Sequence, residues 1–176
     1  MIEKEKKIRV VIGLGNPGDK YIRNRHNIGF RVLDVLSEKL NVFWKTSDLM
    51  DLTEAIIDEA RVLLIKPLTY MNNSGKIIPF LLKKGIKSEE ILVVHDELEK
   101  KFANLSIKLG GSARGHNGLR SIIDVLGKDF WRLRFGIGRP ESLSVSDYVL
   151  SNFSQDEEIQ VPELIEKSVE LILKNS

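Results

Sequence analysis

A polar loop between a short apolar run and the first helical pattern carries residue types that are suited to chemistry. The apolar run spans residues 8–12, and the loop spans residues 13–29. Within the loop, Asn16 supplies an amide and His26 an imidazole, and further amides and glycines accompany them. Loops that a rigid strand holds in place are common positions for catalytic groups. The density of polar side chains therefore predicts a functional site.

Polar side chains also follow two other apolar runs and a glycine-rich loop. The runs span residues 61–65 and 91–94, and the loop spans residues 110–115. The residues that follow them are Met71, Asn72, His95, Asp96, His116 and Asn117. In open α/β sheets, ligands gather beyond the carboxyl ends of the strands. If these strands are parallel neighbours, one histidine, one aspartate and three amides meet in one cleft.

Each of these residues also has an ordinary structural interpretation. A single loop histidine such as His26 is more often a surface residue, and Asn16 before a proline suits a turn. Asn72 or Asn73 is of a type that caps a helix. His95 ends an apolar run, and we interpret it as a packed structural histidine. The coincidence of polar groups at three strand ends favours the functional interpretation for the rest.

Composition limits the class of protein. The chain has 176 residues, of which 42% are hydrophobic and 30% charged, and these values suit one soluble domain covering residues 1–176. Cysteine is absent, which excludes disulfides and thiolate zinc sites and fits a reducing cytoplasm. No apolar run is long enough to span a bilayer, and the charged start, residues 1–7, does not resemble a signal peptide. A net charge of +2 permits a nucleic-acid partner only through a local patch.

Strand patterns alternate with helical patterns along the chain. The short apolar or β-branched runs that predict strands are residues 8–12, 54–58, 61–65, 91–94, 105–109 and 131–137. The helical patterns are residues 28–40, 72–84, 116–126 and the tail from 154 onward. This alternation predicts an α/β fold, with a single three-layer domain built on a twisted, mixed and mostly parallel sheet that has helices on both faces.

The glycines of the first loop also fit a nucleotide-binding fingerprint. Gly13, Gly15 and Gly18 have the spacing of the dinucleotide motif. That motif opens a helix at once, so that the helix N-terminus meets a pyrophosphate. Here the helical pattern begins only near Ile28, and no acidic residue ends a second strand at the required place. The sequence therefore argues against nucleotide binding.

With these motifs assembled, the chain resembles the bacterial-type peptidyl-tRNA hydrolase family. The matching segments are residues 13–18 with 21 and 25–29, 66–75, 95–98, 108–111, 115–119 and 132–138. They come in the family's order and cover most of the chain. Three departures are visible, and one of them is that the segment 139–144 lacks a lysine found in some relatives. The glycine-rich loop carries Ser112, Ala113 and Arg114 where many relatives have glycines or a histidine, and the carboxy-terminal part is short.

The resemblance implies an enzyme that cleaves the ester between a peptide and the terminal ribose of tRNA, without metal or cofactor, as a cytoplasmic monomer. It implies that His26 is the catalytic histidine and Asp96 its partner. It also implies substrate-binding positions at Asn16, Tyr21, Met71, Asn72, His116 and Asn117. Lys108 and Arg134 match the basic pair that the family uses at the 5′-phosphate of tRNA. Arg120 and Arg132 are interpreted as ordinary solvated charges.

The residue types fit ester hydrolysis independently of the resemblance. A neutral histidine can accept a proton from water, and an aspartate on its other ring nitrogen fixes the tautomer. An amide NH₂ can donate to a developing oxyanion. The chain has no cysteine and no Gly-x-Ser-x-Gly elbow, which favours direct attack by water. The sequence leaves open which amide serves the oxyanion, and a non-catalytic RNA-binding module remains the main alternative.

Overall fold

A seven-stranded sheet forms the centre of the molecule. The computed structural model describes residues 7–176, so all of the charged start except Lys7 lies outside the described residues. The strands are β1 (Val10–Gly13), β2 (Lys45–Thr46), β3 (Met50–Ile57), β4 (Ala60–Pro67), β5 (Ile91–Glu97), β6 (Leu105–Leu109) and β7 (Trp131–Gly136). Their order is β2-β3-β4-β1-β5-β7-β6. The central strands β4, β1, β5 and β7 are mutually parallel, and β2, β3 and β6 pair antiparallel at the edges.

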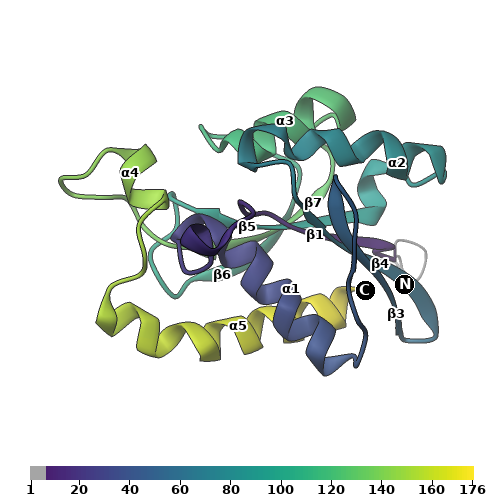
Figure 1. The fold of residues 1–176 in the computed structure, drawn as a ribbon, viewed down its shortest axis with the longest axis horizontal. Helices are drawn as coiled ribbons and strands as arrows, with labels where there is room; N and C mark the ends of the chain where they lie inside the picture. Colours follow the sequence, from purple (N-terminus) through teal and green to yellow (C-terminus); the bar gives the residue numbers. More distant parts are fainter. Residues whose placement is uncertain (1–6) are drawn as a thin grey trace.

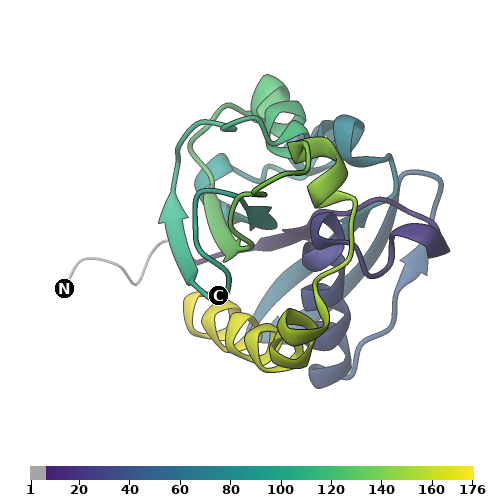
Figure 2. The same cartoon turned by 90° about the vertical axis from the view of Figure 1, so that its left-hand side faces the viewer.

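Helices cover both faces of this sheet. They are α1 (Ile28–Lys39), α2 (Ile78–Lys83), α3 (Asn117–Leu126), α4 (Val145–Val149) and α5 (Gln155–Asn175). Figure 1 shows α2 and α3 on one face and α1 and α5 on the other, and Figure 2 shows the same three layers from the end where α4 lies. The predicted α/β class, with a mixed sheet between two helical layers, is confirmed. That residues 1–176 form one domain stays a prediction.

The central strands are buried on both faces because each face packs against a helical layer. Val11 on β1 lies in the cluster with α1 and α5, whereas Val10 and Ile12 lie in the cluster with α2 and α3. Every residue of β1 and of β5 is buried. Such double burial explains why these strands appear in the sequence as continuous apolar runs. No helix of the described residues has the length and apolar character needed to cross a membrane.

Several predicted elements differ from the structure in their bounds. The strand expected at 8–12 begins at Val10, and the strand expected at 54–58 begins already at Met50. It forms the predicted hairpin with β4, and Asp58 and Glu59, both with positive φ, make the two-residue turn. The single helix expected at 72–84 is wrong. A 3₁₀ segment, Met71–Ile77, precedes α2, because Pro79 at the start of α2 has no N–H to continue an α-helix backward.

Candidate active site

The polar loop that follows β1, residues 14–27, is fixed by a close approach between α1 and the ends of β1 and β5. The Leu14 N–H donates to the Val94 carbonyl at 3.1 Å, which extends the β1–β5 pairing into the loop. A Cβ atom on Gly29 would lie 2.4 Å from the Leu14 nitrogen and 2.5 Å from the Val94 oxygen, so only glycine fits there. His26 lies on the 3₁₀ turn Arg25–Asn27 directly before α1. The loop therefore places His26 at the carboxyl end of β5.

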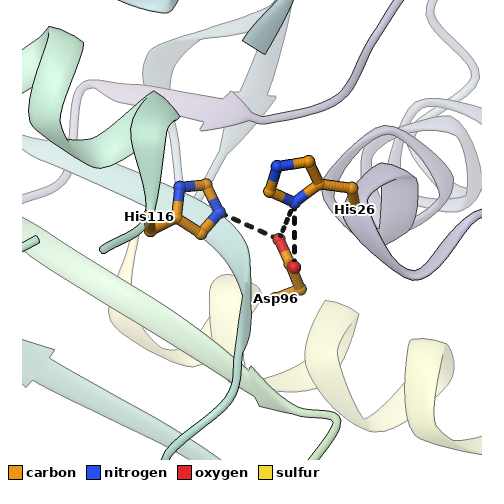
Figure 3. Close-up of side chains that lie close together, drawn as sticks. All are labelled: His26, Asp96 and His116. Carbon is orange, nitrogen blue, oxygen red and sulfur yellow. Dashed lines mark hydrogen bonds and ion pairs between the residues drawn. The ribbon is translucent and has the colours of Figure 1, made fainter. Parts of the chain in front are cut away.

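Two histidines converge on one buried carboxylate (Figure 3). Asp96, on β5, is 2% exposed. Its carboxylate oxygens both lie 2.9 Å from Nδ1 of His26, and Oδ1 lies 2.9 Å from Nε2 of His116. The first histidine comes from the loop after β1, and the second from the end of the glycine-rich loop, at the N-cap of α3. The structure thus brings together three side chains that are far apart in the sequence.

The hydrogen bonds assign the tautomers of both rings. Nδ1 of His116 accepts from the Leu119 N–H at 3.2 Å, so the proton of a neutral His116 is on Nε2, which donates to Asp96. A carboxylate only accepts, so Nδ1 of His26 also carries a proton. In a neutral His26 the second nitrogen, Nε2, is then unprotonated, and Figure 3 shows it pointing away from Asp96. This is the protonation state that a general base requires.

Asp96 stays charged although it is buried. Burial on its own would raise the pKa of Asp96, but the two histidines and their hydrogen bonds hold that pKa well below its ordinary value. The pKa of His95 is also lowered, but for a histidine this favours the neutral form. Burial and the neighbouring His116 lower the pKa of His95 to about 4, and its Nδ1 lies 2.9 Å from the Asp96 backbone oxygen. His95 is therefore neutral at pH 7 and does not line the main cleft, as its interpretation as a packed histidine requires.

We expect the buried His95 to make stability depend on pH. Its folded-state pKa of about 4 lies below its ordinary value of 6.5, so the unfolded chain binds the proton more tightly. Its contribution is complete above about pH 6.5 and is lost as pH falls toward 4, with a slope near 1.4 kcal/mol per pH unit inside that window. His95→Asn keeps a donor for the Asp96 carbonyl but cannot titrate. Chemical denaturation at several pH values should show a shallower fall for this variant. Equal slopes would contradict the expectation.

The main cleft opens directly beside these histidines. It encloses about 480 Å³, and the predicted positions that line it are Asn16, Tyr21, His26, Met71, Asn72, Asp96, His116 and Asn117. The structure therefore places His26, Asp96 and all three amides of the sequence prediction in one cavity. Their individual roles in a reaction stay predictions.

Asn16 is the most firmly held of the three amides. Its Oδ1 accepts from the Met71 N–H at 2.7 Å, which identifies the oxygen and leaves the Nδ2 group as a donor. Its backbone exchanges two hydrogen bonds of 2.9 Å with the side chain of Asn27. By contrast, Asn72 and Asn117 are exposed and make no side-chain hydrogen bond in the described part of the chain. Asn16 is therefore not merely a turn residue.

Three residues that the sequence analysis did not select also position the cleft. Asn27 ties the two ends of the first loop together through Asn16. Tyr70 has φ +62°, an uncommon value for a non-glycine residue, and it directs the following Met71 N–H toward Asn16. Arg25 is the third. The only sequence signal for Arg25 and Asn27 was that they flank His26, and Tyr70 had no such signal.

Arg25 ties the polar loop after β1 to the segment between α4 and α5. Its guanidinium is buried and donates to the Ser151 hydroxyl at 2.6 Å, the Asn152 carbonyl at 2.8 Å and the Glu157 carboxylate at 2.9 Å. It also lies 4.0 Å from the centre of the Tyr148 ring. These contacts join His26 to α4, whose residues Val145 and Val149 border the cleft.

A second, small pocket lies next to the main cleft, and we call it the basic pocket. Its lining residues are Glu97, Lys108, Gly110, Gly111, Ser112, Arg114, Arg132 and Arg134. Lys108 on β6 pairs with Arg132 on β7, and Arg134 lies two residues further on the same face. Like charges directly opposite each other are unfavourable in a sheet. The two predicted phosphate residues therefore share a cation cluster outside the main cleft.

The interpretation of Arg132 as a solvated charge is wrong. Arg132 is 3% exposed, and its guanidinium donates to the carbonyls of Ser112 at 2.7 Å, of Gly111, and of Lys128 at 3.3 Å. An arginine fork binds several carbonyls of a loop at once, which holds the glycine-rich loop in place. Arg120 is exposed, in agreement with its interpretation.

His26, Asp96 and His116 also have the composition of a metal-binding group, since their ligand atoms lie within 4.8 Å of one another. The hydrogen bonds oppose this use. Nε2 of His116 has to be unprotonated to bind a metal, which would move its proton to Nδ1 and abolish the cap on the Leu119 N–H. The ring nitrogens that face Asp96 are donors, so the residues fit a hydrogen-bonded group better than a metal site.

Comparison with known proteins decides the family. A family model described as peptidyl-tRNA hydrolase matches residues 10–175. The chain belongs to the peptidyl-tRNA hydrolase family. It is 43% identical over 170 residues to the peptidyl-tRNA hydrolase of Fervidobacterium nodosum, covering 94% of this chain and 89% of the relative. It is 44% identical over 171 residues to that of Sulfurimonas denitrificans, covering 95% and 91%.

Solved peptidyl-tRNA hydrolases share the fold. The structure of the enzyme from Acinetobacter baumannii is 36% identical and superposes with a TM-score of 0.90, covering 98% of this chain and 91% of that one. Its Arg119Gln mutant gives a TM-score of 0.93 at 34% identity, covering 98% and 90%. The resemblance inferred from the motifs is confirmed, and the protein is an enzyme of the hydrolase class.

Proposed function

We propose that the enzyme hydrolyses the ester between the peptide and the 3′-terminal ribose of peptidyl-tRNA, and so returns tRNA to translation. The observation that carries the proposal is the hydrogen bonding of the His26 ring and its position at the cleft. Its Nδ1–H is held by Asp96, and Nε2, which is unprotonated in a neutral ring, has no hydrogen-bond partner in the described residues and borders a cleft large enough for a substrate end. When the His26 ring is neutral, this arrangement supplies a base for water. The proposal also includes action in the cytoplasm as a monomer.

The reaction follows from the positions of these groups. A water molecule beside Nε2 of His26 attacks the ester carbonyl carbon while Nε2 takes its proton. Asp96 stabilises the imidazolium that forms, because its carboxylate is charged and accepts from Nδ1. The tetrahedral intermediate then collapses, the bond from carbonyl carbon to ribose oxygen breaks, and His26 returns the proton to that oxygen. The products are a free peptide acid and tRNA with its terminal hydroxyl restored.

Asn16 is the best placed of the three amides for the oxyanion. Its oxygen is engaged by the Met71 N–H, and its backbone by Asn27, so the Nδ2 donor is preorganised. Preorganised donors stabilise a transition state because they need no rearrangement as charge develops. Asn72 and Asn117 are exposed at the cleft wall and free to turn. We assign these two to the first peptide group of the substrate.

We expect the enzyme to require a blocked amine on the substrate. An amide group at the cleft wall hydrogen-bonds a peptide unit, whereas a free ammonium brings a charge that has no carboxylate partner there apart from Asp96 and Glu97, which are already engaged. Turnover of N-acetyl-aminoacyl-tRNA should therefore exceed that of the free aminoacyl-tRNA by a large factor. Release of the amino acid from both substrates is the measurement. Equal rates would refute the assignment, and no turnover of either would favour the RNA-binding module.

We further propose that the basic pocket binds the 5′-phosphate of tRNA through Lys108 and Arg134. Lys108→Ala and Arg134→Ala should each reduce the log–log salt slope of tRNA binding by about 1 and weaken the preference for 5′-phosphorylated tRNA. The exposed Arg120→Ala, which removes the same charge on α3, is the control and should leave that preference unchanged. If both test variants prefer the 5′-phosphate as strongly as the parent does, the phosphate binds elsewhere.

A further inference from the structure

The basic pocket contains one carboxylate, and that side chain also borders the main cleft. Glu97, the last residue of β5, follows Asp96 directly and lines both cavities. It is 9% exposed. Nε of Arg134 donates to its Oε1 at 2.8 Å, and the Glu99 N–H donates to its Oε2 at 3.3 Å. An acid is therefore fixed inside the cation cluster proposed to receive a phosphate.

The cations of the pocket are not equally available. Arg132 is occupied by backbone carbonyls, and Arg134 is occupied by Glu97. In the described part of the chain, Lys108 and Arg114 make no ion pair. Burial would raise the pKa of Glu97, but the hydrogen bond from Arg134 holds that pKa below its ordinary value, so Glu97 is charged at neutral pH. An incoming anion thus finds one arginine already paired.

The charge of the anion decides whether it can displace this carboxylate. A terminal phosphate monoester carries close to two negative charges at neutral pH and three acceptor oxygens, whereas an internal phosphodiester carries one charge. Arginine binds a phosphate through paired donors, so a phosphate dianion, with its greater negative charge and three acceptor oxygens, binds Arg134 more strongly than the Glu97 carboxylate does. A phosphodiester has the same single charge as Glu97, so it cannot displace this carboxylate and is repelled by it. Rejection by a built-in like charge is a common source of specificity.

We propose that Glu97 is a specificity-determining residue, which holds Arg134 in the free enzyme and yields it only to a terminal phosphate monoester of RNA. The proposal rests on the proposed function, because it takes the basic pocket to be the site of the tRNA 5′-phosphate. It adds that Glu97 keeps internal phosphodiesters out of that pocket. The same side chain stands at the border of the main cleft, so the two cavities share one wall.

The test is a binding comparison between Glu97→Gln and the parent. Glutamine keeps an oxygen that accepts from Arg134 but removes the charge. The ligands are deacylated tRNA with its 5′-phosphate and the same tRNA after phosphatase treatment, at one fixed salt concentration. We expect Glu97→Gln to bind the dephosphorylated tRNA roughly 3–10-fold more tightly, with a smaller gain for the phosphorylated form, so that the preference shrinks. Glu99→Gln removes a neighbouring charge that pairs with Arg139 outside the pocket, and it should shift both forms equally.

Each outcome separates the two proposals. A parent enzyme without preference for the 5′-phosphate overturns the phosphate site and, with it, the role of Glu97. A parent with a preference that Glu97→Gln retains in full overturns the role of Glu97 alone. A second readout needs no variant. The Nε–H signal of Arg134 in the NMR spectrum of the parent should shift with phosphorylated tRNA and stay unchanged with dephosphorylated tRNA. The same response to both forms would also overturn the proposal.

Discussion

Replacing His26 with alanine should lower kcat by about 10²–10⁴-fold or more, the range that general-base catalysis typically contributes. The reason lies in the tautomer. His26 is the histidine whose Nδ1–H is held by Asp96 while Nε2 is free in the main cleft. His116 has both ring nitrogens engaged, and His95 is buried away from the cleft, so neither replaces it. Binding of deacylated tRNA should change little, because the basic pocket is separate.

The measurement is single-turnover hydrolysis of N-acetyl-aminoacyl-tRNA, with circular dichroism to verify the fold. His95→Asn is the matched control, since it removes a histidine of the same cluster that does not line the cleft. It should stay within a few-fold of the parent at neutral pH. Turnover near the parent level in folded His26→Ala would show that another group activates the water.

Asp96→Asn should lower kcat by roughly 10²–10³-fold, less than the loss for His26→Ala. Two N–H donors face this carboxylate, from His26 and from His116. An asparagine has only one oxygen. The cap on Leu119 fixes Nε2–H on His116, so that ring requires the oxygen, and the NH₂ group is left facing His26. His26 then favours its other tautomer, with the proton on Nε2, where it cannot serve as a base.

The pH–rate profile distinguishes this effect from a loss of packing. In Asp96→Asn the imidazolium of His26 loses its charged partner, so the lower limb of the profile should move to lower pH. Asp156→Asn makes the same chemical change at an exposed position in the first turn of α5 and should alter neither kcat nor the profile. An unchanged profile and kcat in Asp96→Asn would refute the pairing of His26 with Asp96.

The layered fold was predictable because its signals are local. The apolar runs of β1 and β5 and the periodic patterns of α1, α3 and α5 are visible in short windows. The bounds of the 71–83 segment were not, because they depend on how one proline competes with a favourable helical pattern. The very short β2 and α4 gave too few residues for a periodic signal.

That His26, Asp96 and the three amides would share one cleft could be predicted from the sequence, whereas the hydrogen bonds between these residues could not. Polar residues after apolar runs located His26, Asp96 and the amides, because parallel strands end at one edge. The Asp96 carboxylate accepts from two histidines because His116 caps α3 through its other ring nitrogen. This cap is a feature of the three-dimensional structure and leaves no pattern in the sequence. The burial of Arg132 was missed for a related reason. Its partners are backbone carbonyls of a loop, and the direction in which a carbonyl points cannot be predicted from the residue types.

The ring of His116 connects the first turn of α3 to the charged carboxylate of Asp96. Whenever the start of α3 frays, the Leu119 amide loses its acceptor, and the ring is free to change tautomer and withdraw its proton from Asp96. Local opening of helix ends is far more frequent than global unfolding, and amide hydrogen exchange records it. The exchange rate of the Leu119 amide thus measures how often the hydrogen bond from His116 to Asp96 is released.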